Sequence, residues 1–158
     1  MQELDAEPLG KGRRIAIAVA RFNAEVTDRL LAGALEALRG AGVAEKNLTV
    51  VRVPGSFELP LAAQTLARTR RFDAIVALGA VIRGETDHYD YVCRAAQEGL
   101  MRVGLDERLP VLFGVLTCDR EEQAMDRAGG KHGNKGADVA LDALRLVAIH
   151  ERLRRRRR

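Results

Sequence analysis

The stretch from Gly79 to Tyr91, with the sequence Gly-Ala-Val-Ile-Arg-Gly-Glu-Thr-Asp-His-Tyr-Asp-Tyr, organises the rest of the chain. It follows the apolar run 74–78, which predicts a buried strand. After it, small and apolar residues recur at helical spacing on one face: Val92, Ala95, Ala96, Gly99 and Val103. Gly84 permits a tight turn, and Asp87 is a good N-cap with Asp90 three residues on. The stretch is therefore predicted to be a strand–loop–helix junction.

This junction has the parts of a small anion-binding site. Backbone N–H groups near Glu85 and Thr86 would lie at or just before the N-terminus of the helix, where anions bind. His88 would lie in the first turn and supplies one titratable imidazole. Two ordinary alternatives stay open at this point. Most glycine-containing turns bind nothing, and a lone histidine in a first turn is more often a surface or capping residue.

Length and composition indicate one domain with a substantial core. The chain has 158 residues, 47% apolar and only 4% aromatic, which predicts a single domain over residues 14–153 after an N-terminal arm, residues 1–13. No apolar run approaches the roughly 20 residues of a membrane span, and no signal peptide opens the chain, so we expect no membrane association. Cys93 and Cys118 match neither a metal-ligand nor a disulfide spacing, which favours the cytoplasm.

Positive charge is concentrated at the C-terminal end. The net charge is +4, and residues 154–158 alone supply five positive charges, so the remainder sums to +4 − 5 = −1. Consecutive arginines repel each other and lack apolar partners, so residues 154–158 are expected to be a disordered tail. We expect no specific nucleic-acid partner. The alternative is weak, salt-sensitive binding of nucleic acid through the tail.

Strand and helix patterns alternate along the chain. Apolar runs predict four strands: residues 14–20, 48–53, 74–78 and 111–118. A helical pattern follows each run, and predicted capping residues are Asn23, Ser56 and the pair Asp119 and Glu122. No hairpin turn separates the strands, so the fold class is α/β, a three-layer α/β/α sandwich with a central four-stranded parallel sheet. Because four strands are few, we expect the N-terminal arm to extend the edge of a neighbour's sheet.

Ligands of open parallel sheets bind beyond the carboxyl ends of the strands, and three unusual segments are predicted there. They are Phe22-Asn23, residues 55–58 and residues 80–88. The ring of Phe22 suits stacking on a planar heterocycle, although packing on the end of the sheet is its ordinary alternative. Glu58 suits binding of sugar-like hydroxyl groups, although a carboxylate at a helix N-terminus is favourable in itself. Convergence of the three segments on one edge favours a site.

Two further candidates are predicted at the opposite edge. Phe113 is near the start of the fourth strand, and Arg127 is near the end of the helix that returns from it. Five strand residues span roughly 16 Å, so neither side chain should reach the site of its own subunit. Arg127 and Lys135 together would form a clamp for phosphate or carboxylate. If these residues serve the site, an adjacent subunit must supply them.

Four segments, taken together in order and spacing, resemble the lumazine synthase family from Arg14 to about His150. They are Val53-Pro-Gly-Ser-Phe-Glu-Leu-Pro60, residues 79–88, Gly114-Val-Leu-Thr117, and Arg127-Ala-Gly-Gly-Lys-His-Gly-Asn-Lys-Gly136. The resemblance implies a flavodoxin-like strand order and the condensation of 5-amino-6-(D-ribitylamino)uracil with 3,4-dihydroxy-2-butanone 4-phosphate. The products would be 6,7-dimethyl-8-ribityllumazine, phosphate and water, in riboflavin biosynthesis, without a metal or redox cofactor.

The resemblance also implies a role for each site residue. Phe22 would stack on the pyrimidinedione, and His88 would donate and accept protons. The ring and ribityl chain would be held by Asn23, Ser56, Phe57, Glu58, Ala80, Val81 and Ile82. The phosphate would be held by Glu85, Thr86 and Arg127. The neighbouring subunit would complete the substrate site with Phe113 and Lys135.

Assembly is implied in the same way. The resemblance implies a homopentamer, and association with riboflavin synthase as a further partner. It also implies a hollow icosahedral shell of twelve pentamers, because the compact turn 129–135 lacks the insertion of relatives that stop at pentamers or decamers.

Two rival functions fit the same fold class. A flavodoxin-like binding module would hold a nucleotide without chemistry and would not need Arg127 and Phe113 across an interface. A shell protein that had lost catalysis would not need an intact set of Phe22, His88 and Arg127. The presence of that set favours the enzyme.

Overall fold

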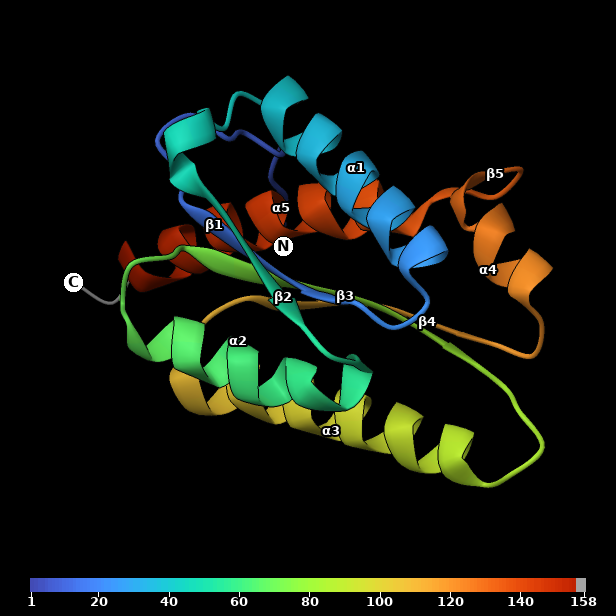
Figure 1. Cartoon of the computed structure of the whole chain (residues 1–158). Helices are drawn as coiled ribbons and strands as arrows, with labels where there is room; N and C mark the ends of the chain where they lie inside the picture. The colour runs from blue at the N-terminus through green and yellow to red at the C-terminus, as the bar shows by residue number, and fades with distance from the viewer. Residues whose placement is uncertain (156–158) are drawn as a thin grey trace.

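Four parallel strands form the centre of the molecule in the computed structural model, which describes residues 1–155 (Figure 1). The strands are β1 (Ile15–Ala20), β2 (Leu48–Val53), β3 (Ala74–Ile82) and β4 (Val111–Cys118), in the order β2-β1-β3-β4. The main helices are α1 (Ala24–Gly40), α2 (Leu59–Arg68), α3 (His88–Glu107), α4 (Glu121–Asp126) and α5 (Lys135–Arg155). Helices α1 and α5 cover one face of the sheet, and α2 and α3 cover the other. The predicted three-layer sandwich and flavodoxin-like order are confirmed.

Strand β1 lies inside the sheet, and all six of its residues are buried. Alternate side chains serve different layers: Ile15 and Ile17 pack with α1 and α5, whereas Ala16 and Ala18 pack with α2 and α3. A strand covered on both faces needs an uninterrupted apolar run, and this strand has one. The apolar runs in the sequence therefore locate the strands well.

Strand β3 is longer than the sequence predicts. Ala80, Val81 and Ile82 belong to the strand, where the sequence analysis places them in a loop. They pair in parallel with Leu116 to Cys118 of β4, so the length of the neighbouring strand extends the ladder beyond Gly79. The predicted loop before α3 is correspondingly shorter and covers residues 83–87.

A small antiparallel ribbon lies outside the main sheet. Strands β5 (Ala128–Gly130) and β6 (Gly133–Asn134) follow α4, in the segment predicted to be a basic loop. Gly129 and Gly133 have φ values of 98° and 74°, a left-handed conformation that favours glycine. The expectation that no hairpin joins strands therefore holds for the four-stranded sheet and is wrong for this ribbon.

Two predicted N-caps make no capping hydrogen bond. Asn23 stands at the N-cap position of α1 but has a left-handed backbone, with φ 58° and ψ 48°. Its side-chain amide instead donates to the carbonyl oxygen of Ala80 at 2.8 Å. Asp87 stands at the N-cap position of α3, with helical backbone angles and no side-chain cap. A capping side chain needs an extended backbone at its own residue, and neither position has one.

The other two predicted caps are displaced by neighbouring residues. Ser56 is buried in a short 3₁₀ turn (Ser56–Glu58), and the Glu58 carboxylate accepts from the Gly55 N–H at 2.9 Å. At α4, the Gln123 side-chain oxygen accepts from the backbone N–H groups of Asp119 and Arg120 at 2.9 and 3.1 Å. The capping box therefore lies one residue after the predicted pair.

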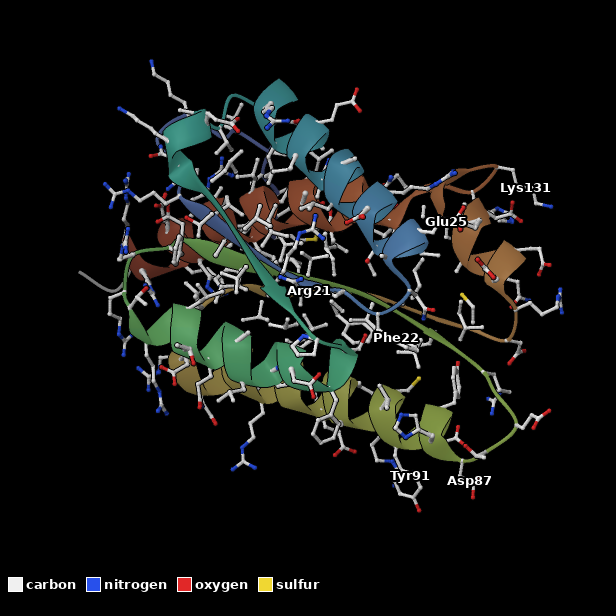
Figure 2. All side chains as sticks on the ribbon, viewed as in Figure 1. Arg21, Phe22, Glu25, Asp87, Tyr91 and Lys131 are labelled. Atoms are coloured by element: carbon white, nitrogen blue, oxygen red, sulfur yellow. The ribbon has the colours of Figure 1, made fainter. Side chains whose placement is uncertain are left out.

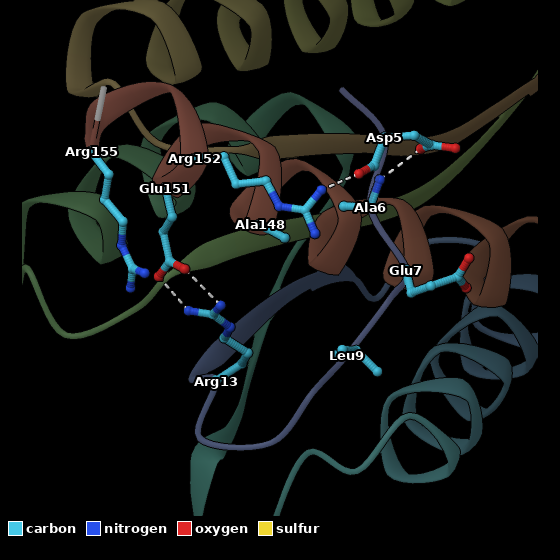
Figure 3. A pocket seen from close by; sticks show the side chains of 9 residues that line it. All are labelled: Asp5, Ala6, Glu7, Leu9, Arg13, Ala148, Glu151, Arg152 and Arg155. Atoms are coloured by element: carbon cyan, nitrogen blue, oxygen red, sulfur yellow. Dashed lines mark hydrogen bonds and ion pairs between the residues drawn. The ribbon is translucent and has the colours of Figure 1, made fainter. Parts of the chain in front are cut away.

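The N-terminal arm lies against α5 of its own chain and contains no strand. Figure 3 shows the Arg13 guanidinium facing the Glu151 carboxylate, with two hydrogen bonds of 2.5 and 2.8 Å. The Arg152 side chain donates to the Asp5 carbonyl oxygen. These contacts enclose a cleft of about 440 Å³. Pairing of the arm with a neighbour's sheet stays a prediction.

The start of the predicted tail is helical. Helix α5 continues to Arg155, so the expectation of disorder is wrong for Arg154 and Arg155. The Arg154 guanidinium donates to the Arg108 carbonyl oxygen at 3.2 Å, which anchors this last turn. Residues 156–158 of the predicted tail lie outside the described residues. Across residues 1–155, no helix is both long and apolar enough to cross a membrane.

Candidate active site

A cleft of about 700 Å³ opens at the carboxyl ends of β1, β2 and β3. The segments that leave β1 and β2 stay hydrogen-bonded beyond the strands and so shape this cleft. The N–H groups of Arg21 and Phe22 donate to the carbonyl oxygens of Val53 and Pro54 at 2.8 and 3.0 Å. Most of the predicted binding residues line this one space. They are Phe22, Asn23, Ser56, Phe57, Glu58, Ala80, Val81, Ile82, Thr86 and His88.

Two exposed aromatic rings mark one side of the cleft. Phe22 is 72% exposed and Phe57 is 60% exposed, so both rings are available to a ligand. Figure 2 shows Phe22 just beyond β1, between the start of α1 and the start of the segment that leads into α2. A flat apolar ring held at a cleft offers a stacking surface for a planar heterocycle.

The floor of the cleft depends on a close approach between two segments. Ser56 is buried, and a Cβ atom at Gly79 would collide with its Oγ. Glycine at position 79 therefore lets the turn 56–58 sit directly on β3. The Glu58 Oε2 atom is engaged by the Gly55 N–H, so the alternative of a local capping role for Glu58 is present in the structure.

His88 is the first residue of α3 and is exposed at the cleft. The loop before it contributes Gly84 and Thr86 to the lining. Glu85 is exposed but lies outside the residues that line the cleft. Of the two residues predicted to flank a bound phosphate in this loop, the structure therefore brings only Thr86 to the cleft.

Arg127 lies in a second cleft of about 440 Å³, at the end of β4. Its neighbours there include Thr117, Cys118 and Tyr89, so its predicted position at the opposite edge of the sheet is wrong. Helix α4 has only six residues and rises about 9 Å, whereas the eight residues of β4 extend about 26 Å. The short helix therefore leaves Arg127 near the carboxyl edge.

Lys135 stands beside Arg127, as the predicted clamp requires. The Lys135 N–H donates to the Arg127 carbonyl oxygen at 2.8 Å, and both residues are exposed. Phe113 pairs with Ala77, five residues before the last pair of the β3–β4 ladder, and is 40% exposed. Neither Arg127, Lys135 nor Phe113 lines the 700 Å³ cleft of its own chain.

Tyr89 lines both clefts and is not among the site residues predicted from the sequence. Burial raises the pKa of the Tyr89 hydroxyl, which hydrogen-bonds with Thr117 and Cys93. Burial also raises the pKa of the Cys93 and Cys118 thiols, both of which are free. The sequence does contain a signal for Tyr89. This residue follows His88 in the first turn of a predicted helix, which places it between that helix and the adjacent strand.

Within residues 1–155, no group of three or more His, Cys, Asp or Glu side chains is placed to hold a metal ion. The chemistry that the cleft itself offers is stacking, hydrogen bonding and proton transfer through one imidazole.

Comparison with known proteins bears on both clefts. The family model for 6,7-dimethyl-8-ribityllumazine synthase matches residues 12–151, which include every residue that lines the 700 Å³ cleft. A 6,7-dimethyl-8-ribityllumazine synthase from Desulfatibacillum aliphaticivorans is 51% identical over 144 residues, covering 91% of this chain and 93% of the relative. The chain therefore belongs to the 6,7-dimethyl-8-ribityllumazine synthase family.

Proposed function

We propose that the chain catalyses the condensation of 5-amino-6-(D-ribitylamino)uracil with 3,4-dihydroxy-2-butanone 4-phosphate. The product is 6,7-dimethyl-8-ribityllumazine, so the protein is a transferase of riboflavin biosynthesis. The observation that carries this proposal is the single cleft that joins an exposed ring, a buried serine turn and one imidazole in a member of this family.

The uracil substrate occupies the part of the cleft near Phe22. The exposed Phe22 ring stacks on the pyrimidinedione, as its position at the end of β1 supports. The turn Ser56–Glu58 and the end of β3, residues 80–82, hold the ring and the ribityl chain. The Asn23 amide bonds to the Ala80 carbonyl, so Asn23 acts by fixing the wall that the substrate touches.

His88 moves protons during the chemistry. The 5-amino group attacks the ketone carbon, and loss of one water gives an imine. Elimination breaks the C–O bond to phosphate, which leaves with the bonding electron pair, and the resulting enol tautomerises to a ketone. The ribitylamino nitrogen attacks this second carbonyl, and loss of another water closes the ring. Each step needs a proton delivered or removed near the reacting atoms, which an exposed imidazole at the cleft can do.

The phosphate lies at the α3 end of the cleft. Thr86 contacts it near the start of α3, where the helix dipole favours an anion, and Glu85 stands beside Thr86 just outside the cleft. Arg127 and Lys135 of a neighbouring subunit supply positive charge, and Phe113 of that subunit closes the site. All three side chains are exposed and lie outside the cleft of their own chain, which supports this division between subunits.

A ring of subunits agrees with this division, and the family resemblance implies that the ring is a homopentamer. A contact that joins one surface of a subunit to a different surface of the next is heterologous, and it closes into a ring when the rotation between subunits closes. Large apolar side chains exposed on the outer helices support association: Leu61 on α2, and Met101 and Leu105 on α3. We further propose the twelve-pentamer shell, association with riboflavin synthase and a cytoplasmic location, all of which the family resemblance implies.

The test is product identity. Purified protein is mixed with both substrates in the presence of a chelator, and lumazine absorbance and fluorescence are followed, with mass spectrometry of the product. We expect one lumazine and one phosphate per condensation, at a rate above the uncatalysed reaction. Well-folded protein that leaves the uncatalysed rate unchanged would refute the proposed function.

A further inference from the structure

Arg83 joins three elements at the base of the loop that precedes α3. It is the first residue after β3, and its N–H donates to the Cys118 carbonyl oxygen at 2.9 Å. This bond continues the pairing between β3 and β4 one step beyond the ladder. The backbone of Arg83 is therefore fixed against the end of β4.

The Arg83 side chain reaches the first turn of α3. Its Nε donates to the Asp119 carboxylate at 2.9 Å, and its Nη1 lies 3.7 Å from the Asp90 carboxylate. The guanidinium carbon stands 4.1 Å from the centroid of the Tyr89 ring, well within the range of a cation–π contact. Tyr89 and Asp90 directly follow His88, so the contacts hold the turn that presents the imidazole.

The loop of residues 84–87 makes few other polar side-chain contacts. Residues 84–87 are exposed, and among the described residues none of their side chains makes a hydrogen bond or ion pair. Asp87 makes no side-chain cap, so the start of α3 lacks the usual local anchor. Arg83 thus supplies the charged side-chain contacts between this turn and the end of β4, beside the hydrogen bond of Tyr89 with Thr117.

We propose that Arg83 is a positioning residue that sets the place of the His88 imidazole relative to the sheet; this inference rests on the proposed function. The guanidinium faces Asp119, Asp90 and the Tyr89 ring, and Arg83 does not line the substrate cleft. It therefore acts through His88 and not by touching substrate. Exposed ion pairs add little to stability, whereas a displacement of about 1 Å in a reacting group costs up to about 10²-fold in rate.

The test compares Arg83→Gln and Arg83→Lys with a matched control. Arg102 is also an exposed arginine paired with an aspartate, Asp106, on the same helix and outside the cleft. We expect Arg83→Gln to lower kcat about tenfold, with KM for each substrate changed less than about twofold. Arg83→Lys should recover part of the loss, because it keeps the charge beside Asp119 but loses the planar group over Tyr89. Arg102→Gln should match the wild type.

Measuring Arg83→Gln in a His88→Ala background separates a positioning role for Arg83 from a general loosening of the fold. In a His88→Ala background, Arg83→Gln should lower kcat by less than about twofold, because the group that it positions is gone. An equal loss in both backgrounds overturns the proposal, as does an unchanged kcat. A rise in KM for the phosphate substrate alone also overturns it, because that result assigns Arg83 to direct phosphate binding.

A readout without turnover keeps the inference separate from the proposed function. Crystal structures of wild type and Arg83→Gln should differ by about 1 Å in the position of His88 relative to β4. An unmoved His88 refutes the positioning role even if the wild type proves active. A moved His88 in a protein that makes no lumazine keeps the positioning role and refutes only the proposed function.

Discussion

His88 is the one histidine that lines the 700 Å³ cleft; His132 lies in the turn between β5 and β6, and His150 lies near the end of α5. Its exposure leaves the imidazole free to exchange protons with a ligand in the cleft. The neighbouring contacts that hold it come through Tyr89 and Asp90, and thus from Arg83. The proposed function depends at this scale on the His88 imidazole and on the residues that position it.

Replacing His88 with alanine should slow turnover by about 10². Loss of a general acid–base group typically costs about 10²–10⁴ in rate, and we expect the low end because these reactants condense without a catalyst. KM should stay close to the wild-type value, since Phe22 and the turn 56–58 remain. Steady-state kinetics of His88→Ala, with His150→Gln as the control variant, measure both turnover and KM. Unchanged turnover in His88→Ala would remove the imidazole from the mechanism.

Single residues were the hardest part of the site to predict from sequence. Phe22, Ser56 and His88 were placed correctly at one edge, because each follows a strand of a parallel sheet. The capping roles of Asn23 and Ser56 were wrong, because Asn23 bonds to Ala80 and Ser56 packs under Gly79. Ala80 and Gly79 are distant in sequence from Asn23 and Ser56, so no local sequence pattern predicts these contacts.

At the scale of elements, α1 and α5 pack so closely that one glycine is required between them. A Cβ atom at Gly136, in the first turn of α5, would overlap the Leu30 carbonyl oxygen of α1. Gly136→Ala should therefore lower the free energy of unfolding by about 1–3 kcal/mol. Gly40→Ala is the control, because Gly40 is also helical and meets nothing within 4 Å.

Urea unfolding midpoints of the two variants decide between packing and helix propensity. Alanine favours a helix over glycine by up to about 1 kcal/mol, so Gly40→Ala should be neutral or slightly stabilising. A Gly136→Ala protein as stable as the Gly40→Ala protein would show that the two helices can separate without cost.

The ion pair between the N-terminal arm and α5 should stabilise the fold less as the pH falls. Hydrogen bonds from Arg13 lower the pKa of Glu151 below its usual value of 4.5. A carboxyl group with a lowered folded-state pKa stabilises the fold above 4.5, and this contribution is lost as pH falls through the lowered value. The difference in Tm between wild type and Glu151→Gln should thus be present at neutral pH and shrink below about pH 4.5.

Glu36→Gln provides the comparison for this pH series. Glu36 is exposed on α1 and, among the described residues, makes no ion pair. Its Tm difference from wild type should stay small at every pH. A difference for Glu151→Gln that is constant from about pH 3 to about pH 7 would mean that the ion pair does not hold the arm.

Elements were predicted well where apolar runs define them. The runs 48–53 and 111–118 coincide with β2 and β4, although both are edge strands and only partly buried. The end of β3 was missed, since its last three residues are fixed by pairing with β4. The predicted position of Arg127 at the opposite edge is wrong because α4, with six residues, is too short to cross back over the sheet.

At the scale of the whole molecule, one chain presents two separate candidate surfaces. The cleft at the ends of β1 to β3 has the ring and the imidazole, and the surface beyond β4 has Arg127 beside Lys135. A ring of subunits would bring the second surface of one chain to the cleft of the next. The sequence suggests the proposed division between subunits, but only the structure locates both surfaces near the carboxyl edge.

Mixed assemblies test the shared site. His88→Ala subunits and Arg127→Ala subunits are dissociated, mixed and reassembled, and mass spectrometry verifies that the particles contain both. Some sites then combine His88 of one subunit with Arg127 of another, so part of the lost activity should return. Absence of recovery in verified mixed particles would contradict the shared site, as would full activity in a monomer.

The central claim is that lumazine forms in the cleft that Phe22 and His88 line. The most direct measurement is the initial rate of lumazine formation by wild type and by the double variant Phe22→Ala, His88→Ala, with folding of both verified by circular dichroism. We predict a wild-type rate above the uncatalysed reaction and a double-variant rate close to it. A double variant as fast as the wild type, or a folded wild type no faster than buffer, would contradict the account.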